Sequence, residues 1–172
     1  YLEEVQAMLL EGARPSEIDA ALEGFGLAMG PNAMMDLAGL DVGWRIRQEQ
    51  RRTGTLRDEK ARLYRVADGF IETGRHGQKT GAGFYRYAPG DRRPLPDPEI
   101  EALYEAEAAR QGIAQRKPSA DEIVERCLIR LANTGAQILD EGIALRASDI
   151  DTIYLNGYGF PAHQGGPMFW AD

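Results

Sequence analysis

Cysteine and histidine are scarce in this chain of 172 residues, which contains one cysteine and two histidines. A single cysteine, Cys127, excludes an intramolecular disulfide, and its apolar helical surroundings (EIVERCLIRLA) are typical of a buried structural thiol. His76 and His163 lie in glycine-rich loops, and neither has a second His or Cys at metal-ligand spacing. Disulfide-stapled folds and metal sites are therefore disfavoured.

Long hydrophobic runs are also missing. No apolar stretch approaches the ~20 residues that a membrane-spanning helix requires, and no secretory signal is recognisable. Together with the single cysteine, this favours a reducing intracellular compartment, and we expect a cytoplasmic protein. The sequence opens at Tyr1, already within a helical pattern, so we expect an excised piece of a longer chain.

Positive charge is outweighed, with 20 Lys and Arg against 27 Asp and Glu and a net charge of −7. This balance disfavours nucleic acid as a partner. Residues 43–65 are the exception, with eight basic and three acidic side chains. Such a segment suits a polyanionic ligand or an acidic partner, but a solvated helix face with local ion pairs explains the same charges and is favoured.

Glycine, in contrast, is abundant and divides the chain into helical patterns. A helix is expected over 2–12, and a capping box at 16–19 opens a short one that Gly24 closes. Pro31 suits the first turn of a helix that runs to about Arg52. That helix is expected to bend at two internal glycines, Gly39 and Gly43.

The rest of the chain continues this helical pattern. One helix is expected over 56–74, with an extended stretch at 83–87. The Pro-rich segment 88–98 is typical of a linker, and Asp97 then caps a polar helix. Capping boxes at 119–122 and 148–151 open a long amphipathic helix and a short one.

One pattern occurs twice. GFGLAMGPNAMMD (24–36) and GYGFPAHQGGPMFWAD (157–172) both contain Gly-aromatic-Gly, then Gly-Pro, then an Asp five residues after that Pro. An Ile-Asp pair precedes each, at 18–19 and at 150–151. A duplicated helical unit explains this order. The N–H groups that open the Gly-Pro helix are expected to be unpaired, which suits an anion or a carbonyl; a helix corner without a ligand is the favoured alternative.

The other glycine-rich stretch, GRHGQKTGAGFY at 74–85, resembles a phosphate-binding loop only superficially. Such a loop has a first Gly, four intervening residues and then Gly-Lys-Ser/Thr, and it follows a buried strand and opens a helix. Here Lys79-Thr80 follows Gln78, and a helix precedes the stretch. No βαβ unit surrounds any Gly-rich segment, so no dinucleotide fingerprint is assigned.

These motifs carry a family resemblance. GFGLAMGPNAMMDLAGLDVG followed by GRHGQKTGAGFYRY resembles the C-terminal helical domain of the 3-hydroxyacyl-CoA dehydrogenases. GYGFPAHQGGPMFWAD resembles the second, degenerate copy of that domain in the fused multifunctional enzymes of fatty-acid β-oxidation, which also contain an enoyl-CoA hydratase domain. The resemblance implies an all-α fold with two tandem copies packed as a pseudo-dimer. The copies are 1–88, truncated at its N-terminus, and 119–172, truncated at its C-terminus, joined by a linker and polar helix at 89–118.

The resemblance also implies which parts of the enzyme lie outside this chain. Family members bind NAD on an N-terminal Rossmann domain, which carries a catalytic His–Glu pair and a substrate-contacting Ser; a further Asn precedes the first helix of the C-terminal domain. We therefore expect no catalytic, cofactor or metal residue here. The parent enzyme would oxidise 3-hydroxyacyl-CoA to 3-oxoacyl-CoA, with this chain supplying part of the substrate cleft and a dimer-like scaffold.

Two sets of candidate site residues follow. By resemblance, one loop lies near the acyl end of the substrate cleft; its residues are Gly26, Leu27, Met29, Gly30 and Pro31. Basic side chains can meet the phosphates of CoA as charged donors, and the candidates are Arg51, Arg52, Lys60 and Lys79. In the second copy, the loop containing Pro161, His163 and Gln164 is expected to form an interface.

Partners, compartment and packing follow from the same resemblance. The implied partners are an acyl-CoA substrate, the Rossmann and hydratase domains, and a homo-oligomer or a thiolase; the location is the bacterial cytosol, or the peroxisome or mitochondrion of a eukaryote. An all-helical dimerisation domain of another hydroxyacid dehydrogenase, or a stand-alone interaction module, remains the alternative. We expect the copies to pack around a pseudo-two-fold axis, with Phe160 and Trp170 buried between them.

Overall fold

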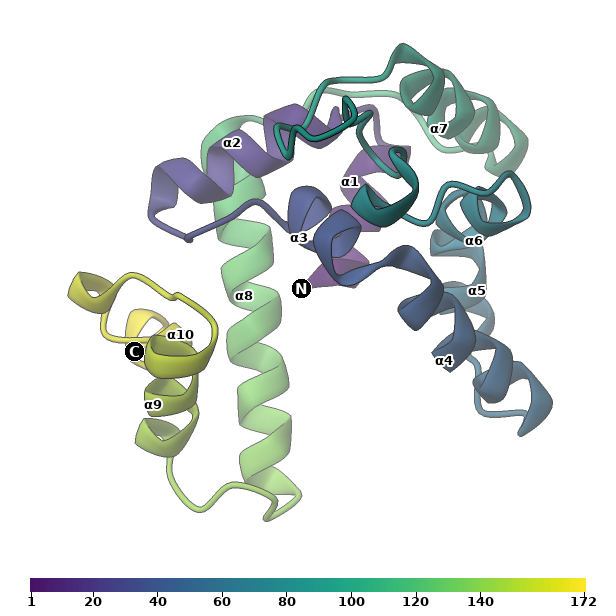
Figure 1. Cartoon of the computed structure of the whole chain (residues 1–172). Helices are drawn as coiled ribbons and strands as arrows, with labels where there is room; N and C mark the ends of the chain where they lie inside the picture. Colours follow the sequence, from purple (N-terminus) through teal and green to yellow (C-terminus); the bar gives the residue numbers. More distant parts are fainter.

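The computed structural model describes all 172 residues (Figure 1). Its regular secondary structure consists of helices, joined by loops, with only isolated β-bridges near residues 77–95. This confirms the all-α prediction. The first half contains α1 (Leu2–Leu10), α2 (Pro15–Phe25), α3 (Pro31–Ala38), α4 (Leu40–Arg52), α5 (Asp58–Leu63), α6 (Arg65–Glu72) and the 3-10 turn η1 (Gln78–Thr80). The second half contains α7 (Pro98–Gln111), α8 (Ala120–Asp140), α9 (Ala147–Gly157), η2 (Ala162–Gln164) and α10 (Pro167–Trp170). None of these helices combines the length and apolar composition that crossing a membrane requires.

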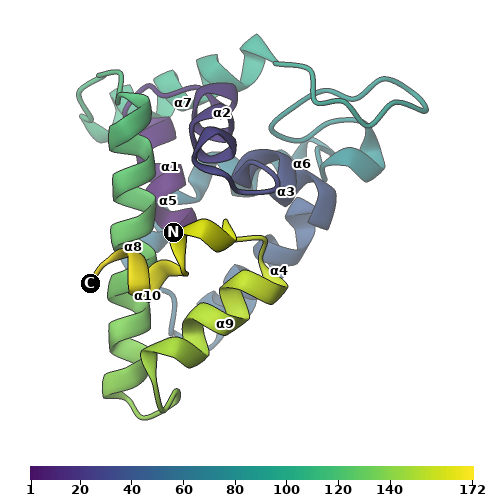
Figure 2. The same cartoon turned by 90° about the vertical axis from the view of Figure 1, so that its left-hand side faces the viewer.

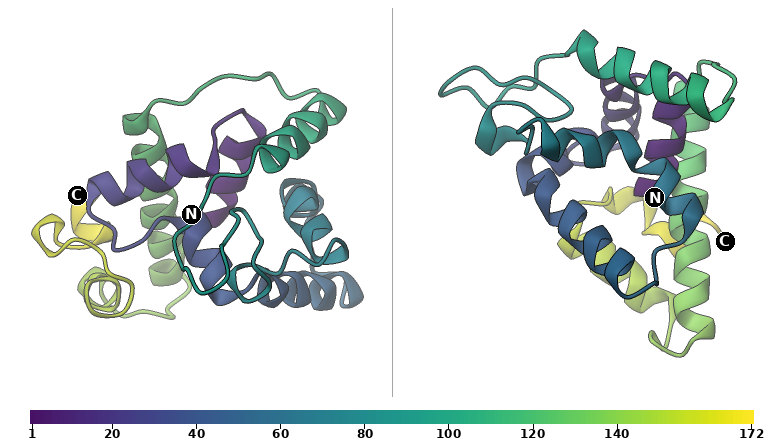
Figure 3. Two further views of the ribbon diagram at one scale, coloured as in Figure 1. Left: turned by 45° about the horizontal axis from the view of Figure 1, so that its top comes forward. Right: turned by 90° about the vertical axis from the view of Figure 1, so that its right-hand side faces the viewer.

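The main core is built around α1, which packs against α5, α7 and α8. Val5, Met8 and Leu9 of α1 are almost completely buried. The polar-looking helix α7 adds Ile100 and Ala108 to the same core, so it packs with the first half of the chain even though its outer face is charged. The segments on either side of α7 run along the outside of the molecule (Figure 3).

The long helix α8 belongs to both halves of the molecule. Its N-terminal part places Ile123 and Cys127 in the main core, which confirms the buried thiol. Its middle forms a second, smaller cluster with Phe160, and Phe25 and Leu27 of the first half pack onto that cluster. The remaining helices α9 and α10 pack against α8 and against each other (Figure 2).

The predicted burial of the two aromatic residues is confirmed for Phe160 and is weaker for Trp170. Phe160 is 3% exposed and meets Phe25 edge-to-face, with ring centroids 5.6 Å apart. Trp170 is only half-buried at the edge of the same cluster. The contact of this cluster with the first half of the chain therefore centres on Phe160.

Two of the four predicted helix caps are correct. The Ser119 hydroxyl accepts a hydrogen bond from the Glu122 N–H, and the Asp97 carboxylate accepts one from the Glu99 N–H. The boxes at 16–19 and 148–151 were wrong: α2 begins at Pro15 and α9 at Ala147, with arginines at the N-cap positions. The aspartates of these two boxes have another role, described below.

Helix boundaries differ from expectation where glycine or packing interrupts a turn. The helix expected to close at Gly24 continues to Phe25 and ends at Gly26. The φ of Gly26 is 119°, a conformation that glycine adopts without steric cost. The chain breaks at Gly39 (φ 95°) rather than bending there, which separates α3 from α4. The helix expected over 56–74 is divided at Tyr64 into α5 and α6.

Candidate functional site

The corner between α2 and α3 is organised by a buried carboxylate. The side chain of Asp19 accepts hydrogen bonds from the backbone N–H groups of Asn32 and Ala33, both at 2.9 Å. It also accepts from Asn32 Nδ2 at 2.9 Å and from the Tyr85 hydroxyl at 2.8 Å. The expectation of unpaired N–H groups at this helix start was wrong, because Asp19 already occupies the position that an anion would take.

A second aspartate caps a Gly-Pro helix start in the same way in the second half of the chain. Asp151 accepts from the N–H groups of Met168 at 2.7 Å and Phe169 at 3.2 Å, at the start of α10. The glycine before each proline allows the close approach: a Cβ at Gly30 would overlap Asp19, and one at Gly166 would overlap Asp151. In each half, therefore, the aspartate of the Ile-Asp pair contacts the helix start that the Gly-Pro pair forms.

The structure places the five candidate cleft residues together on the α2–α3 loop. Gly30 and Pro31 are buried in the corner, Leu27 is half-buried, and Met29 is 41% exposed. A Cβ on Gly26 would lie 2.9 Å from Pro161, so this glycine faces the loop that contains Pro161. On the other side of this contact, a Cβ on Gly159 would lie 3.1 Å from Ala28. The two Gly-aromatic-Gly loops therefore meet.

The glycine-rich stretch 74–85 wraps a carboxylate of this chain. Asp36, at the end of the first repeat, accepts from the N–H groups of Phe84 at 2.9 Å and Tyr85 at 3.0 Å and from the Tyr87 hydroxyl at 3.0 Å. A Cβ at Gly83 would overlap the Asp36 side chain. Burial raises the pKa of Asp36 to about 6, although these donors act in the opposite direction.

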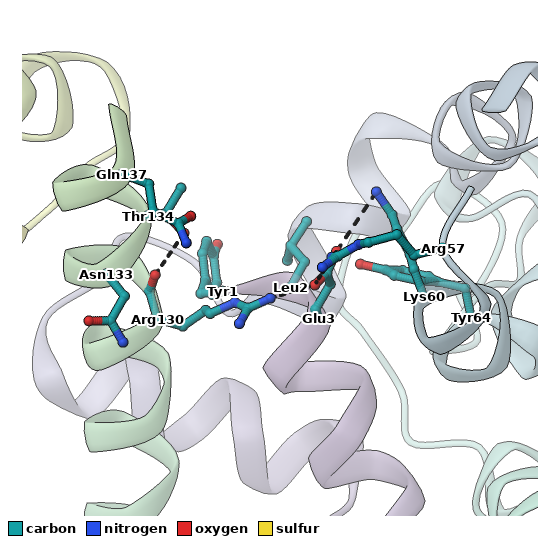
Figure 4. Close-up of a pocket in the computed structure, with 10 residues that line it drawn as sticks. All are labelled: Tyr1, Leu2, Glu3, Arg57, Lys60, Tyr64, Arg130, Asn133, Thr134 and Gln137. Carbon is teal, nitrogen blue, oxygen red and sulfur yellow. Dashed lines mark hydrogen bonds and ion pairs between the residues drawn. The ribbon is translucent and has the colours of Figure 1, made fainter. Parts of the chain in front are cut away.

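A cleft of about 640 Å³ lies between α1, α5 and α8 (Figure 4). Glu3 stands at its centre, and Arg130 Nη2 approaches Glu3 Oε2 at 2.6 Å. From α5, Arg57 Nη2 lies 3.2 Å from Glu3 Oε2 and Lys60 Nζ lies 3.8 Å from Glu3 Oε1. Tyr64 forms a wall of the cleft, and burial raises the pKa of its hydroxyl to about 12. Only Lys60 was singled out from the sequence; Arg130 lies 70 positions further along the chain and carries no motif.

The four basic candidates do not gather at one place. Arg51 Nη2 lies 2.9 Å from Asp68, Arg52 Nε lies 2.8 Å from Glu49, and Lys79 pairs with Asp41. Lys60 alone faces the cleft. Each basic group is next to a carboxylate of this chain, as the favoured ion-pair interpretation of residues 43–65 expects.

Cofactor and metal sites need donor arrangements that these residues do not form. No three or more His, Cys, Asp or Glu side chains are grouped to hold a metal ion. The β-bridges are isolated and antiparallel, so no βαβ unit exists to carry a dinucleotide. The start of α3, the one Gly-Pro helix of eight residues, is already capped by Asp19. The residues of this chain therefore do not fit NAD.

Comparison with known proteins places this geometry in a family. The model of the 3-hydroxyacyl-CoA dehydrogenase C-terminal domain matches residues 1–87. The chain is 52% identical to a peroxisomal bifunctional enzyme of Danio rerio and 46% identical to one of Homo sapiens, in each case over 100% of this chain and 25% of the relative. It is 33% identical to a fatty acid oxidation complex subunit alpha of Shewanella sp. (strain MR-4), over 100% of this chain and 24% of the relative.

A solved structure shares the fold. The dehydrogenase part of multifunctional enzyme 1 from C. elegans matches 95% of this chain and 36% of its own length, with a TM-score of 0.65 and 24% identity. This chain spans about a quarter of the length of the curated relatives that it matches. Because the family model covers half of the chain, we conclude that the chain belongs to the 3-hydroxyacyl-CoA dehydrogenase family and that residues 1–87 are its C-terminal domain.

Proposed function

We propose that this chain is the C-terminal helical part of an NAD-dependent 3-hydroxyacyl-CoA dehydrogenase fused to an enoyl-CoA hydratase. The main support is that all 172 residues match bifunctional enzymes, with 46–52% identity. The parent enzyme oxidises 3-hydroxyacyl-CoA to 3-oxoacyl-CoA in fatty-acid β-oxidation. NAD binds to the Rossmann domain of the parent, and this chain does no chemistry by itself.

The role of this chain in that enzyme is to close the substrate cleft and to provide a dimer-like scaffold. The loop of Gly26, Leu27, Met29, Gly30 and Pro31 faces the acyl end of the substrate. Residues 1–88 and 119–172 act as tandem copies joined by 89–118, an interpretation supported by the facing loops and by the edge-to-face pair of Phe25 and Phe160. Pro161 and His163 belong to this interface.

The surroundings of the parent enzyme follow from its relatives. Their names include peroxisomal bifunctional enzymes and a bacterial fatty acid oxidation complex subunit. We therefore place the parent enzyme in the peroxisome of a eukaryote or in the cytosol of a bacterium, with a mitochondrial location as the further option. A homo-oligomer or a thiolase is its expected protein partner.

The decisive experiment compares two proteins in one assay. The full-length parent and the 172-residue chain are each given 3-hydroxyacyl-CoA and NAD, and NADH production is measured against a no-protein control. We expect NADH from the parent and none from the chain. NADH from the chain, or a folded parent that produces none, would contradict the proposal.

A further inference from the structure

The cleft between α1, α5 and α8 is cation-rich in a protein of net charge −7. Arg57, Lys60 and Arg130 surround a single carboxylate, Glu3. Their charges sum to +2 around a cleft of about 640 Å³, a volume in the range of small-molecule sites. Three separate segments of the chain supply these groups, so the excess of positive charge results from the tertiary fold.

Most of the donors on these cations have no partner within the chain. Lys60 Nζ lies 3.8 Å from Glu3 Oε1, beyond hydrogen-bond distance, and it donates to no other group. Arg57 and Arg130 each use only Nη2, on Glu3, and leave Nε and Nη1 unpaired. Figure 4 shows all three side chains directed towards Glu3 from opposite walls. The cleft therefore presents strong donors that one carboxylate cannot satisfy.

A neighbouring ion-pair network on the same helices shows what a purely structural arrangement looks like. Arg126, one turn before Arg130 on α8, bonds to Glu4, Glu11 and Glu122. Arg116 shares two of these carboxylates. Acidic groups outnumber basic groups in that network, whereas the ratio is reversed in the cleft. The contact between α1 and α8 is thus already held by Arg126, and holding these helices together does not require the additional cations.

We propose that this cleft binds a phosphate dianion through Lys60, Arg57 and Arg130. A phosphate monoester carries about −1.5 to −2 charges at pH 7, which matches the +2 of the cleft. Its oxygens suit the forked donors of arginine and the point charge of lysine. Because α8 contributes Arg130, the site exists only where the second half of the chain packs on the first.

Two ligands could supply this phosphate group: the CoA part of the substrate and free inorganic phosphate. Choosing CoA rests on the proposed function, whereas the phosphate site does not. Binding of inorganic phosphate and of CoA to the 172-residue chain is measured separately by calorimetry at low and constant ionic strength. Binding of CoA at micromolar concentrations with weak binding of inorganic phosphate identifies the substrate as the source; equal affinities identify free phosphate.

Five variants test the residues. Lys60→Gln and Arg130→Gln each remove one charged donor and are expected to weaken binding about tenfold. Glu3→Gln removes the competing carboxylate and is expected to tighten binding roughly threefold. Arg93→Gln, an exposed arginine of the linker paired with Asp91, is the matched control and is expected to change nothing. Arg130→Lys is expected to recover part of the affinity.

The opposite effects on binding, weaker for Lys60→Gln and Arg130→Gln but tighter for Glu3→Gln, distinguish a ligand site from a purely structural ion-pair network. If the cations only hold helices together, Glu3→Gln lowers the free energy of unfolding and leaves phosphate and CoA without saturable binding. Absence of saturable binding to the wild-type chain, or Lys60→Gln and Arg130→Gln behaving as Arg93→Gln, overturns the proposal. These measurements involve no turnover, so their failure leaves the dehydrogenase assay of the parent enzyme unaffected.

Discussion

The two Gly-Pro corners use the same carboxylate contact with very different support. In the first corner, Asp19 satisfies four donors, among them Asn32 Nδ2 and the Tyr85 hydroxyl, and is 5% exposed. In the second corner, Asp151 satisfies two backbone N–H groups, and Phe169 beside it is 68% exposed. The difference shows that the corner itself needs only an aspartate, a glycine and a helix start. Both aspartates are buried, at 5% and 8% exposure, but only Asp19 also accepts from the later loop 83–87, through the Tyr85 hydroxyl.

The largest expected effect comes from removing the two carboxylates in parallel. Asp19→Ala leaves four donors without an acceptor and should lower the free energy of unfolding by about 5 kcal/mol, since each orphaned buried group costs about 1–3. Asp151→Ala should cost about 2 kcal/mol, the loss of one helix cap. Denaturant unfolding of both variants checks the order; equal losses would mean that the additional donors of the first corner contribute nothing.

The next comparison is between the stability losses caused by truncating Phe160 and Trp170. Phe160→Ala should lower the free energy of unfolding by about 4 kcal/mol, because it empties a buried position against Phe25. Trp170→Ala should cost about 2 kcal/mol, since the indole is half-buried. Calorimetry of both variants should show one transition that moves to lower temperature. Two transitions, of which only one shifts, would show that the halves unfold independently.

Asp36 adds a pH dependence, smaller than the losses expected for Asp19→Ala and Phe160→Ala. Its pKa is about 6 in the folded chain against the ordinary value of 3.8 for an aspartate, so the folded state binds more protons between these values. This contribution is complete below about pH 4 and is lost as the pH rises through 6. Its size is about 3 kcal/mol at one pKa unit per 1.4 kcal/mol. Asp172, the corresponding residue of the repeated sequence pattern, is exposed.

The measurement for Asp36 is the stability difference between the wild type and Asp36→Asn from pH 4 to pH 7. We expect this difference to fall by about 3 kcal/mol across the range, with the wild type losing stability relative to the variant as pH rises. Asp172→Asn, which replaces the exposed aspartate at the corresponding position, is the matched control. A constant difference for Asp36→Asn would show that its carboxyl titrates alike in both states.

Local patterns were sufficient to predict most of the helices and the repeat itself. Glycine and proline positions identified the starts of α3, α7 and α10, because these residues act through their own backbone conformation. The capping boxes at 16–19 and 148–151 failed because Asp19 and Asp151 bond to a different helix. Propensity rules consider only neighbours in sequence, and these aspartates find their partners 13 to 18 residues later.

The candidate site was predictable only where one loop contains it. Residues 26–30 form one loop in the structure and Pro31 begins α3, but the pairing of Gly26 with Pro161 depends on the packing of the two halves. The cleft was not predictable in the same way. Glu3, Lys60 and Arg130 come from three distant segments, and no single one of them is unusual for an exposed helix surface. Their significance arises from the positions of α1, α5 and α8 after folding.

The central position of α1 also determines when this chain can acquire its structure during synthesis. The apolar face of α1 is covered by α7 and α8, and Arg126 bonds to Glu11 across a sequence separation of 115 residues. Ribosomes add about 5–20 residues each second, so Val5, Met8 and Leu9 remain uncovered for several seconds while α8 is still being made. Such distant contacts slow folding and expose an aggregation-prone segment. The nascent chain should therefore depend on chaperones until α8 has left the ribosome.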